Sequence, residues 1–123
     1  MVKNIDSILN FAKLNSVIER YKIDAEKIIN GDPNQELQNH YSSDCEQFHV
    51  GVWQSEIGTW KVAYSEHEYC EILSGASKIT DKNGHSITVK TGDRFVIPAG
   101  FEGTWEVLEN CQKVYVIFEA NTQ

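Results

Sequence analysis

The segment GDRFVIPAG occupies residues 92–100 and holds the clearest structural signal in the chain. Gly92 and Asp93 are typical of a tight turn that leads into a strand, because glycine adopts backbone conformations that other residues avoid. Pro98 ends that strand, since proline has no N–H to donate to a sheet. Gly100 then permits the chain to reverse. The segment therefore predicts a short strand between two reversals of the chain.

Similar short strands follow one another on both sides of this segment, from about residue 46 to the end of the sequence. Turn residues separate them at Gly58, Ser74-Gly75, Lys82-Asn83-Gly84 and Thr91-Gly92-Asp93. Strands at this regular spacing, divided by glycine turns, predict an all-β antiparallel sandwich or barrel. The predicted strands are EQFHVGVWQSE, TWKVAYS, EYCEIL, ASKITD, HSITVK, RFVIP, WEVLE and KVYVIFE.

The N-terminal part of the chain has a helical rather than an alternating pattern. Ile8, Phe11 and Leu14 recur at the spacing of one helix face and predict a short helix. A second short helix is predicted over 24–30, where an aspartate could cap its start and Gly31 could end it. We therefore expect one or two short helices before the strands begin.

The composition excludes several classes of protein. The 123 residues carry 11 basic and 18 acidic side chains, a net charge of −7, with 41% hydrophobic residues, as expected of one globular domain. An acidic chain repels phosphate backbones, so we expect no nucleic-acid partner. The apolar run Val114–Phe118 is far shorter than a membrane span, so we expect no membrane contact. The first residues do not resemble a secretory signal, which predicts a cytoplasmic protein.

Two spacings resemble the motifs of the cupin superfamily of small jelly-roll β-barrels. The first is Glu68 followed six residues later by Gly75, and the second is GDRFVIPAG. The longer runs WKVAYSEHEYCEILSG, GDRFVIPAGFEGTWEV and KVYVIFE are similar to the ureidoglycine-aminohydrolase-like cupins and to cupins of ethanolamine utilisation. The resemblance implies a cupin-type jelly-roll β-barrel over 46–123, with residues 1–45 packed on it as a helical or extended segment. It also implies a homodimer.

The resemblance breaks down at the positions where cupins usually hold a metal ion. Typical members supply two histidines and a glutamate from the first motif and a third histidine from the second. Here the first two histidine positions fall on Val62 and Tyr64, or one residue earlier in each case, and the third falls on Gly103. Glu68 is the one ligand that remains. We therefore expect neither a metal site of the usual kind nor a cofactor.

The remaining metal-binding residue types are scattered. Cys45, Cys70 and Cys111 lie far apart without a CxxC pair, which argues against both a disulfide framework and a structural zinc site. His49 shares a predicted strand face with Trp53, so it is the histidine that could enter the barrel and rebuild a site there.

Polar and aromatic residues that share inward faces predict a small-molecule pocket instead. Glu68 lies two residues before Cys70, and Lys113 lies two residues before Tyr115, so each pair lies on one face of a strand. We interpret Glu68 and Lys113 as catalytic and the other members as substrate-binding. The predicted site consists of Tyr64, Glu68, Cys70, Trp105, Lys113 and Tyr115.

Three functional hypotheses follow from this site. In the first, Glu68 is the acid or base of a metal-independent enzyme acting on a small ureido, amine or carboxylate compound, and Lys113 stabilises negative charge. In the second, the same pocket binds a small molecule without transforming it. In the third, the chain is a structural or partner-binding protein whose barrel is filled and inert. The alternative for Glu68 and Lys113 themselves is that they form only a buried ion pair that satisfies the interior.

Overall fold

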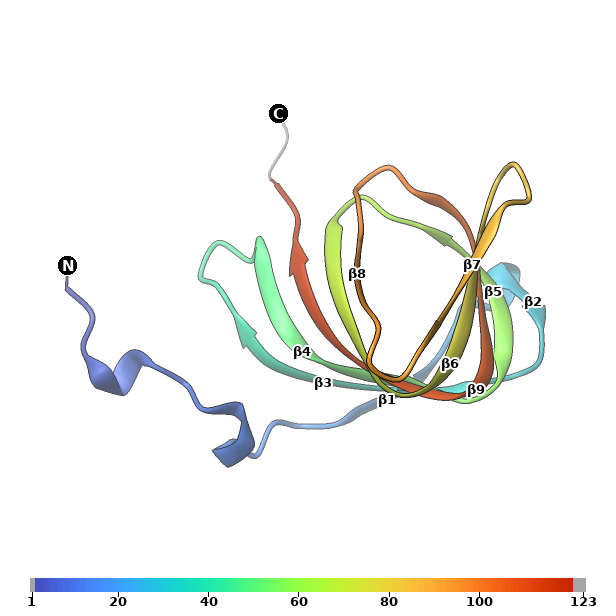
Figure 1. Ribbon diagram of the computed structural model, residues 1–123. Coiled ribbons are helices and arrows are strands. Elements are labelled where there is room, and N and C mark those ends of the chain that lie inside the picture. The colour runs from blue at the N-terminus through green and yellow to red at the C-terminus, as the bar shows by residue number, and fades with distance from the viewer. Residues whose placement is uncertain (1, 121–123) are drawn as a thin grey trace.

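The computed structural model describes residues 2–120 as a strongly curved antiparallel sheet with three short 3₁₀ turns (Figure 1). The 3₁₀ turns are Ile5–Ser7, Phe11–Lys13 and Ala25–Lys27. None of these helical segments is long or apolar enough to cross a membrane, for the part of the chain that is described. The strands are β1 (Glu19–Lys22), β2 (Ile28–Asn30), β3 (Asn34–Ser42), β4 (Phe48–Ser55), β5 (Gly58–Ala63), β6 (His67–Asp81), β7 (Ser86–Lys90), β8 (Arg94–Ile97) and β9 (Glu102–Phe118).

The sheet is organised around the long strand β9. The main path of neighbouring strands runs β1-β3-β4-β9-β5-β2, and β6 pairs with β9 and also with β7 and β8. The predicted all-β architecture is therefore confirmed, whereas the predicted jelly-roll barrel is found only as a curved sheet that is not closed. Strands β7 and β8 are paired with β6, and among residues 2–120 no pairing connects them to the far end of the main path.

The predicted N-terminal helices are reduced to single 3₁₀ turns. Residues 11–13 form one such turn, and the predicted helix over 24–30 becomes a 3₁₀ turn followed by β2, which pairs with β5. The β-branched pair Ile28 and Ile29 favours the extended conformation over a helix. Gly31 does end this segment, with a φ of +83° that suits glycine.

One predicted turn and two predicted strands differ in the structure. Ser74-Gly75 is an irregularity inside the continuous strand β6, where the register against β9 shifts three times between Ile72 and Ser77. A Cβ on Gly75 would collide with the carbonyl of Asn110, which explains the need for glycine there. Opposite this irregularity, WEVLE and KVYVIFE run together in β9. The hairpin between β6 and β7 is confirmed, with its turn ending at Gly84.

The buried core lies on the inner side of the curve. Side chains alternate between the two faces of each strand, so Cys111, Lys113 and Tyr115 of β9 are buried while the residues between them are half-buried. The core is predominantly aromatic and aliphatic, with Trp53, Trp60 and Trp105 at its centre. The sheet therefore directs its largest side chains into the concavity.

Candidate functional site

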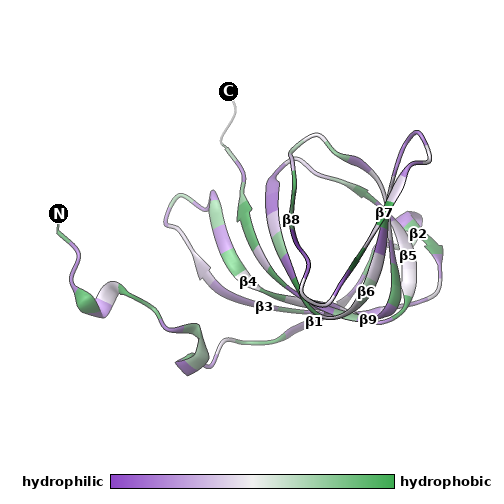
Figure 2. Ribbon diagram, in the orientation of Figure 1, coloured by the Kyte–Doolittle hydropathy of each residue, from purple (hydrophilic) through white to green (hydrophobic). Residues whose placement is uncertain are grey.

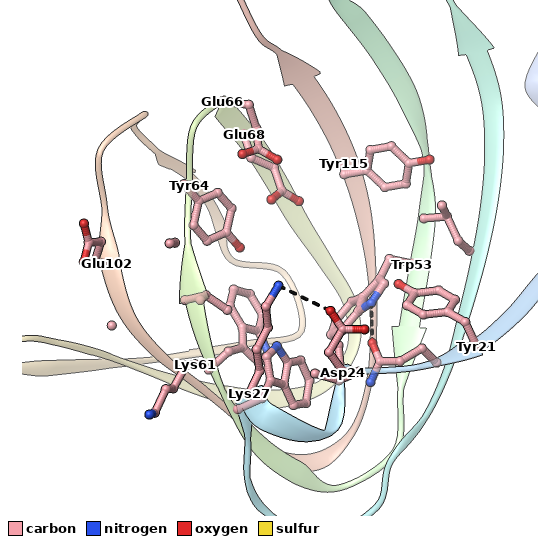
Figure 3. A pocket seen from close by; sticks show the side chains of 18 of the residues that line it. Tyr21, Asp24, Lys27, Trp53, Lys61, Tyr64, Glu66, Glu68, Glu102 and Tyr115 are labelled. Carbon is pink, nitrogen blue, oxygen red and sulfur yellow. Dashed lines mark hydrogen bonds and ion pairs between the residues drawn. The ribbon is translucent and has the colours of Figure 1, made fainter.

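A cavity of about 680 Å³ opens on the concave side of the sheet (Figure 3). Its walls come from β1, β3, β4, β5, β6 and β9 and from the 3₁₀ turn before β2. Figure 3 shows the rings of Tyr21, Tyr64 and Tyr115 around it, with Glu68 between Tyr64 and Tyr115. A cavity of this size suits a small organic molecule. The third hypothesis requires a filled interior, and the open cavity argues against it.

A buried ion pair lines the cavity, and the part of the wall that it forms is called the base of the cavity below. The Lys113 Nζ atom is 2.8 Å from the Glu68 Oε2 atom, and both side chains are 7% exposed. The same Nζ atom lies 4.8 Å from the ring centroid of Trp53 and 4.4 Å from that of Trp105. Lys113 is placed directly opposite Trp53 by the pairing of β9 with β4. The ammonium group is thus held by one carboxylate and two indole faces.

The carboxylate keeps Lys113 in its charged form. Burial is the largest single influence on the pKa of Lys113 and lowers it, but Glu68 together with Tyr64 and Cys70 more than offsets it and holds that pKa above its usual range. A lysine that stays protonated is a poor nucleophile, so covalent chemistry through Lys113 is disfavoured. Its available roles are to donate hydrogen bonds and to stabilise negative charge.

The indole rings are fixed by buried hydrogen bonds. The Trp53 Nε1–H donates to the Gln35 side-chain oxygen over 2.7 Å, and Gln35 in turn donates to the Ser55 hydroxyl. The Trp105 Nε1–H donates to the Ser77 hydroxyl over 3.1 Å. Because both indoles are anchored at their polar edge, their faces are held towards the lysine and the cavity.

The tyrosines add polar groups to the aromatic wall. The Tyr115 hydroxyl donates to the Asn39 side-chain oxygen over 2.7 Å. Burial raises the pKa of both Tyr64 and Tyr115, so these hydroxyls remain neutral hydrogen-bonding groups at ordinary pH. The ring of Tyr64 packs edge-on against Phe101, which positions it beside the cavity. A bound molecule would therefore meet neutral hydroxyls at the wall and charged groups at the base.

Five of the six residues predicted from the sequence line this cavity: Tyr64, Glu68, Trp105, Lys113 and Tyr115. Cys70 is fully buried and lies outside the lining set. Burial raises the pKa of its thiol to about 12, so it is not a ready nucleophile. The ion pair that was the alternative reading of Glu68 and Lys113 is present, and it borders an open cavity rather than a filled interior.

Other lining residues were not predicted. Trp53 and Trp60 are absent from the set predicted from the sequence, and the structure places both in the cavity wall. Tyr21 and Gln35 come from β1 and β3, which the sequence pattern did not indicate. In EQFHVGVWQSE, Trp53 lies on the strand face opposite the valines, and this alternation is the sequence signal that could have identified Trp53 as a lining residue.

The residues present do not fit the metal site that is typical of cupins. A Cβ at Gly103 would collide with the carbonyl oxygen of Thr80, so no ligand side chain could occupy this position without moving the backbone. The carboxylate of Glu68 is engaged by Lys113. Within residues 2–120, no three His, Cys, Asp or Glu side chains come together as metal ligands would.

The histidine that could have entered the barrel lies outside the cavity. His49 lies at the end of β4, where its Nδ1 atom is 2.7 Å from the Ser42 hydroxyl and its Nε2 atom is 3.0 Å from the carbonyl oxygen of Glu46. It is not among the residues that line the cavity. His49 therefore lies in the sheet as an ordinary strand residue, which was the alternative to its entering the barrel.

Residues 42–115 match the model of the EutQ-like cupin domain. The chain belongs to this cupin family. No curated protein matches the chain. Several solved structures share its fold, and three of them show the range of similarity.

A Pseudomonas syringae pv. tomato protein of unknown function, from the DUF861 family, superposes on this cupin with a TM-score of 0.75 at 22% identity. The match covers 84% of this chain but 45% of the Pseudomonas protein, so this cupin spans about half of that protein's length. A putative ethanolamine utilization protein Q from Salmonella typhimurium gives a TM-score of 0.63 at 15% identity, covering 87% of this chain and 99% of that one. A DUF861 family protein from Thermotoga maritima is 31% identical, with a TM-score of 0.53, over 55% of this chain and 76% of its own.

Proposed function

We propose that this cupin binds a small polar organic molecule in the concave cavity, with Glu68 and Lys113 as the groups that recognise it. The observation that carries the proposal is a buried ion pair at the base of an open, aromatic-walled cavity. Buried ion pairs contribute little net stability, because desolvation offsets much of the attraction between the charges. Their presence beside a cavity is therefore more simply explained by recognition than by folding.

The pair defines the chemical class of the ligand. A carboxylate beside an ammonium presents a hydrogen-bond acceptor next to a donor. An amide or ureido group presents the complementary arrangement, an N–H next to a C=O, and an amino acid presents an ammonium next to a carboxylate. The aromatic walls formed by Trp60 and Tyr64 suit the flat or apolar part of such a molecule.

The same arrangement supports proton-transfer catalysis. Glu68 would accept a proton from the bound molecule, and the Lys113 ammonium would stabilise the negative charge that develops on the neighbouring oxygen. The resemblance to ureidoglycine-aminohydrolase-like cupins supports a ureido substrate, and the likeness to a putative ethanolamine utilization protein supports an amine. In this mechanism both groups act directly, and no step requires a metal ion.

A second candidate function is binding without turnover. The Lys113 ammonium is already held by Glu68 and by the faces of Trp53 and Trp105. A group held from three sides is suited to recognising a ligand without changing its own protonation state. This candidate uses the same cavity and differs from the first only in the fate of the ligand.

The two candidates are tested with one panel of compounds. Thermal unfolding of the protein is measured with small amides, ureido compounds, amines and carboxylates. We expect a compound that contains paired donor and acceptor groups to raise Tm, and Glu68→Gln to abolish the rise. Glu71→Gln is the matched control, because Glu71 lies on the same strand with its side chain on the opposite face.

The outcome separates the hypotheses. A stabilising compound that is consumed on incubation supports the enzyme, and one that is recovered unchanged supports the binding protein. If no compound in the panel raises Tm, or if Glu68→Gln and Glu71→Gln lose the response equally, the cavity is not the site that we propose.

A further inference from the structure

The two end strands of the main sheet path are joined directly by a short piece of chain. The path begins with β1 and ends with β2, and residues 23–27 connect these two strands. Five linking residues span at most about 20 Å, so the two ends of the curved path lie within that distance of each other. Residues 23–27 are called the strap below. The strap contributes Ile23, Asp24 and Lys27 to the lining of the cavity.

The strap is anchored at both ends, and these anchors determine where Lys27 lies. Ile23 packs on the hydrophobic core at one end, and Ile28, just beyond the other end, lies directly opposite Trp60 of β5. The residues between these anchors are exposed and mostly hydrophilic (Figure 2). The backbone of Lys27 is therefore held next to an aromatic wall of the cavity, while its long side chain is not packed in place.

The Lys27 ammonium has hydrogen-bonding capacity that the chain does not use. Its Nζ atom lies 3.9 Å from the Asp24 Oδ2 atom, which is too far for a hydrogen bond. Within residues 2–120 it has no closer acceptor, whereas the Lys113 Nζ atom lies 2.8 Å from Glu68. Figure 3 shows the Lys27 ammonium directed over the cavity and the Lys61 ammonium directed away from it. A bound molecule could therefore engage Lys27 without breaking an existing hydrogen bond.

The charge of the cavity lining differs in sign from that of the whole chain. The lining contains five lysines and four acidic residues, a net charge of +1, whereas the chain carries −7. Glu66 and Glu68 lie together on one side of the cavity, apart from the Lys27 ammonium (Figure 3). An anionic group is therefore repelled by most of the protein and by the side of Glu66, and it is attracted to Lys27. The five lysines are Lys22, Lys27, Lys61, Lys82 and Lys113.

The cavity is also larger than the ion pair at its base requires. A volume of about 680 Å³ is typical of sites that hold molecules of drug size. An amide or amino-acid head that pairs with Glu68 and Lys113 has only a few non-hydrogen atoms. At about 30 Å³ for each water-sized group, such a head fills a minor part of the space. The rest of the molecule extends along the aromatic wall, and the strap lies within its reach.

We infer that the ligand of this cavity carries a second polar group, a carboxylate, and that Lys27 binds it at the strap. The inference rests on the proposed function, because it requires the head of the same molecule to lie on Glu68 and Lys113. The apolar middle of the molecule packs against Trp60. Lys27 is then a specificity-determining residue that selects acids over neutral molecules of the same shape. Asp24 opposes this selection, since its carboxylate repels the anion and competes for the same ammonium.

The test uses two matched series of compounds with the full chain. The monoamides of straight-chain dicarboxylic acids, from succinate to suberate, carry an amide head, an apolar chain and a carboxylate. The diamides of the same acids replace that carboxylate with a neutral group of similar shape. Isothermal titration calorimetry gives the dissociation constants. We expect one chain length to fit best, and its monoamide to bind roughly three- to fivefold more tightly than its diamide, as is typical of a partly exposed ion pair.

Two substitutions in the strap should change this preference in opposite directions. Lys27→Met keeps the length of the side chain without its charge and should abolish the preference for the monoamide. Asp24→Asn should increase the preference roughly twofold or more, because it removes the competing carboxylate. Lys61→Met is the matched control, since it removes a positive charge from the same lining and should leave the preference unchanged. All three positions are exposed and Asp24 makes no capping hydrogen bond, so the fold should persist, as circular dichroism would verify.

The outcomes distinguish this inference from the function on which it rests. If monoamides and diamides bind equally well and Glu68→Gln abolishes the binding of both, the proposed function stands and the inference is wrong. If Lys61→Met reduces the preference as much as Lys27→Met does, the overall charge of the lining selects the acid, and the inference is again wrong. If neither series binds to the wild-type protein, the inference and the proposed function fail together.

Discussion

Replacing Glu68 with leucine removes the carboxylate that balances the Lys113 ammonium. Both side chains are 7% exposed, so water cannot solvate the lysine that remains. Removing one member of a buried pair costs about 3–5 kcal/mol of unfolding free energy. We expect Lys113→Met to cost a similar amount, because it leaves the glutamate without its partner. For a domain of this size, either loss lowers Tm by roughly 10–20 °C.

The double variant, Glu68→Leu with Lys113→Met, should behave differently. It removes both charges together and replaces them with apolar side chains, so no buried charge is left unpaired. Substitutions of this kind are close to neutral or even stabilising. We therefore expect the double variant to lose at least about 3 kcal/mol less than the sum of the two single variants.

The assay is urea unfolding followed by tryptophan fluorescence, with all variants at one protein concentration so that any association affects them equally. Glu71→Leu, on the opposite face of β6, is the control and should change the unfolding free energy little. If the two single variants are additive in the double variant, Glu68 and Lys113 are not coupled, and the reasoning about the base of the cavity is refuted.

Further predictions concern pH, backbone packing and thiol reactivity. Because the pKa of Lys113 is raised in the folded protein, the ionised lysine should contribute its full stability below pH ~10.4, and the free energy of unfolding should fall above that pH by about 1.4 kcal/mol per pH unit. Urea unfolding at high pH should show a weaker fall in Lys113→Met than in the wild-type protein. An equal fall in both proteins would contradict the raised pKa. Gly103→Ala should lower the free energy of unfolding by about 1–3 kcal/mol, because the added Cβ would collide with the backbone of β6. Thr104→Ala should lower it less, and equal decreases in the two variants would argue against the collision. A hydrogen bond from Ser43 lowers the pKa of the exposed Cys45 thiol, so Cys45 should react rapidly with a thiol reagent at neutral pH. The buried Cys70 thiol should react only when the protein unfolds. Two rapidly reacting thiols in the folded protein would show that Cys70 is not buried.

The residues at the base of the cavity could be predicted because strand alternation is a local property. Glu68 was fixed by the cupin motif, and Lys113 and Tyr115 alternate with valines that had to face the other way. Alternation does not say which face of a strand is concave when both faces are apolar. This is why the role of Trp53, opposite the valines of β4, stayed open until the structure placed it.

The N-terminal strands could not be predicted in this way. Strand β3 has the sequence NQELQNHYS, in which the buried Gln35 looks like any surface residue until its hydrogen bonds to Trp53 and Ser55 are known. Strand β1 is exposed throughout and depends on its pairing with β3. The open edge of the sheet could not be predicted either, because the periodicity within a strand does not indicate whether distant strands pair.

The most direct test of the central claim is to follow the indole N–H signals of the three tryptophans by NMR while a stabilising compound is added. Trp53, Trp60 and Trp105 all line the cavity, so the account predicts that their signals move together and saturate at one affinity. It also predicts that Glu68→Gln weakens that affinity at least roughly tenfold, as expected for the loss of a charged hydrogen bond. Indole signals that stay fixed while surface amides shift would show that the compound binds elsewhere and would contradict the account.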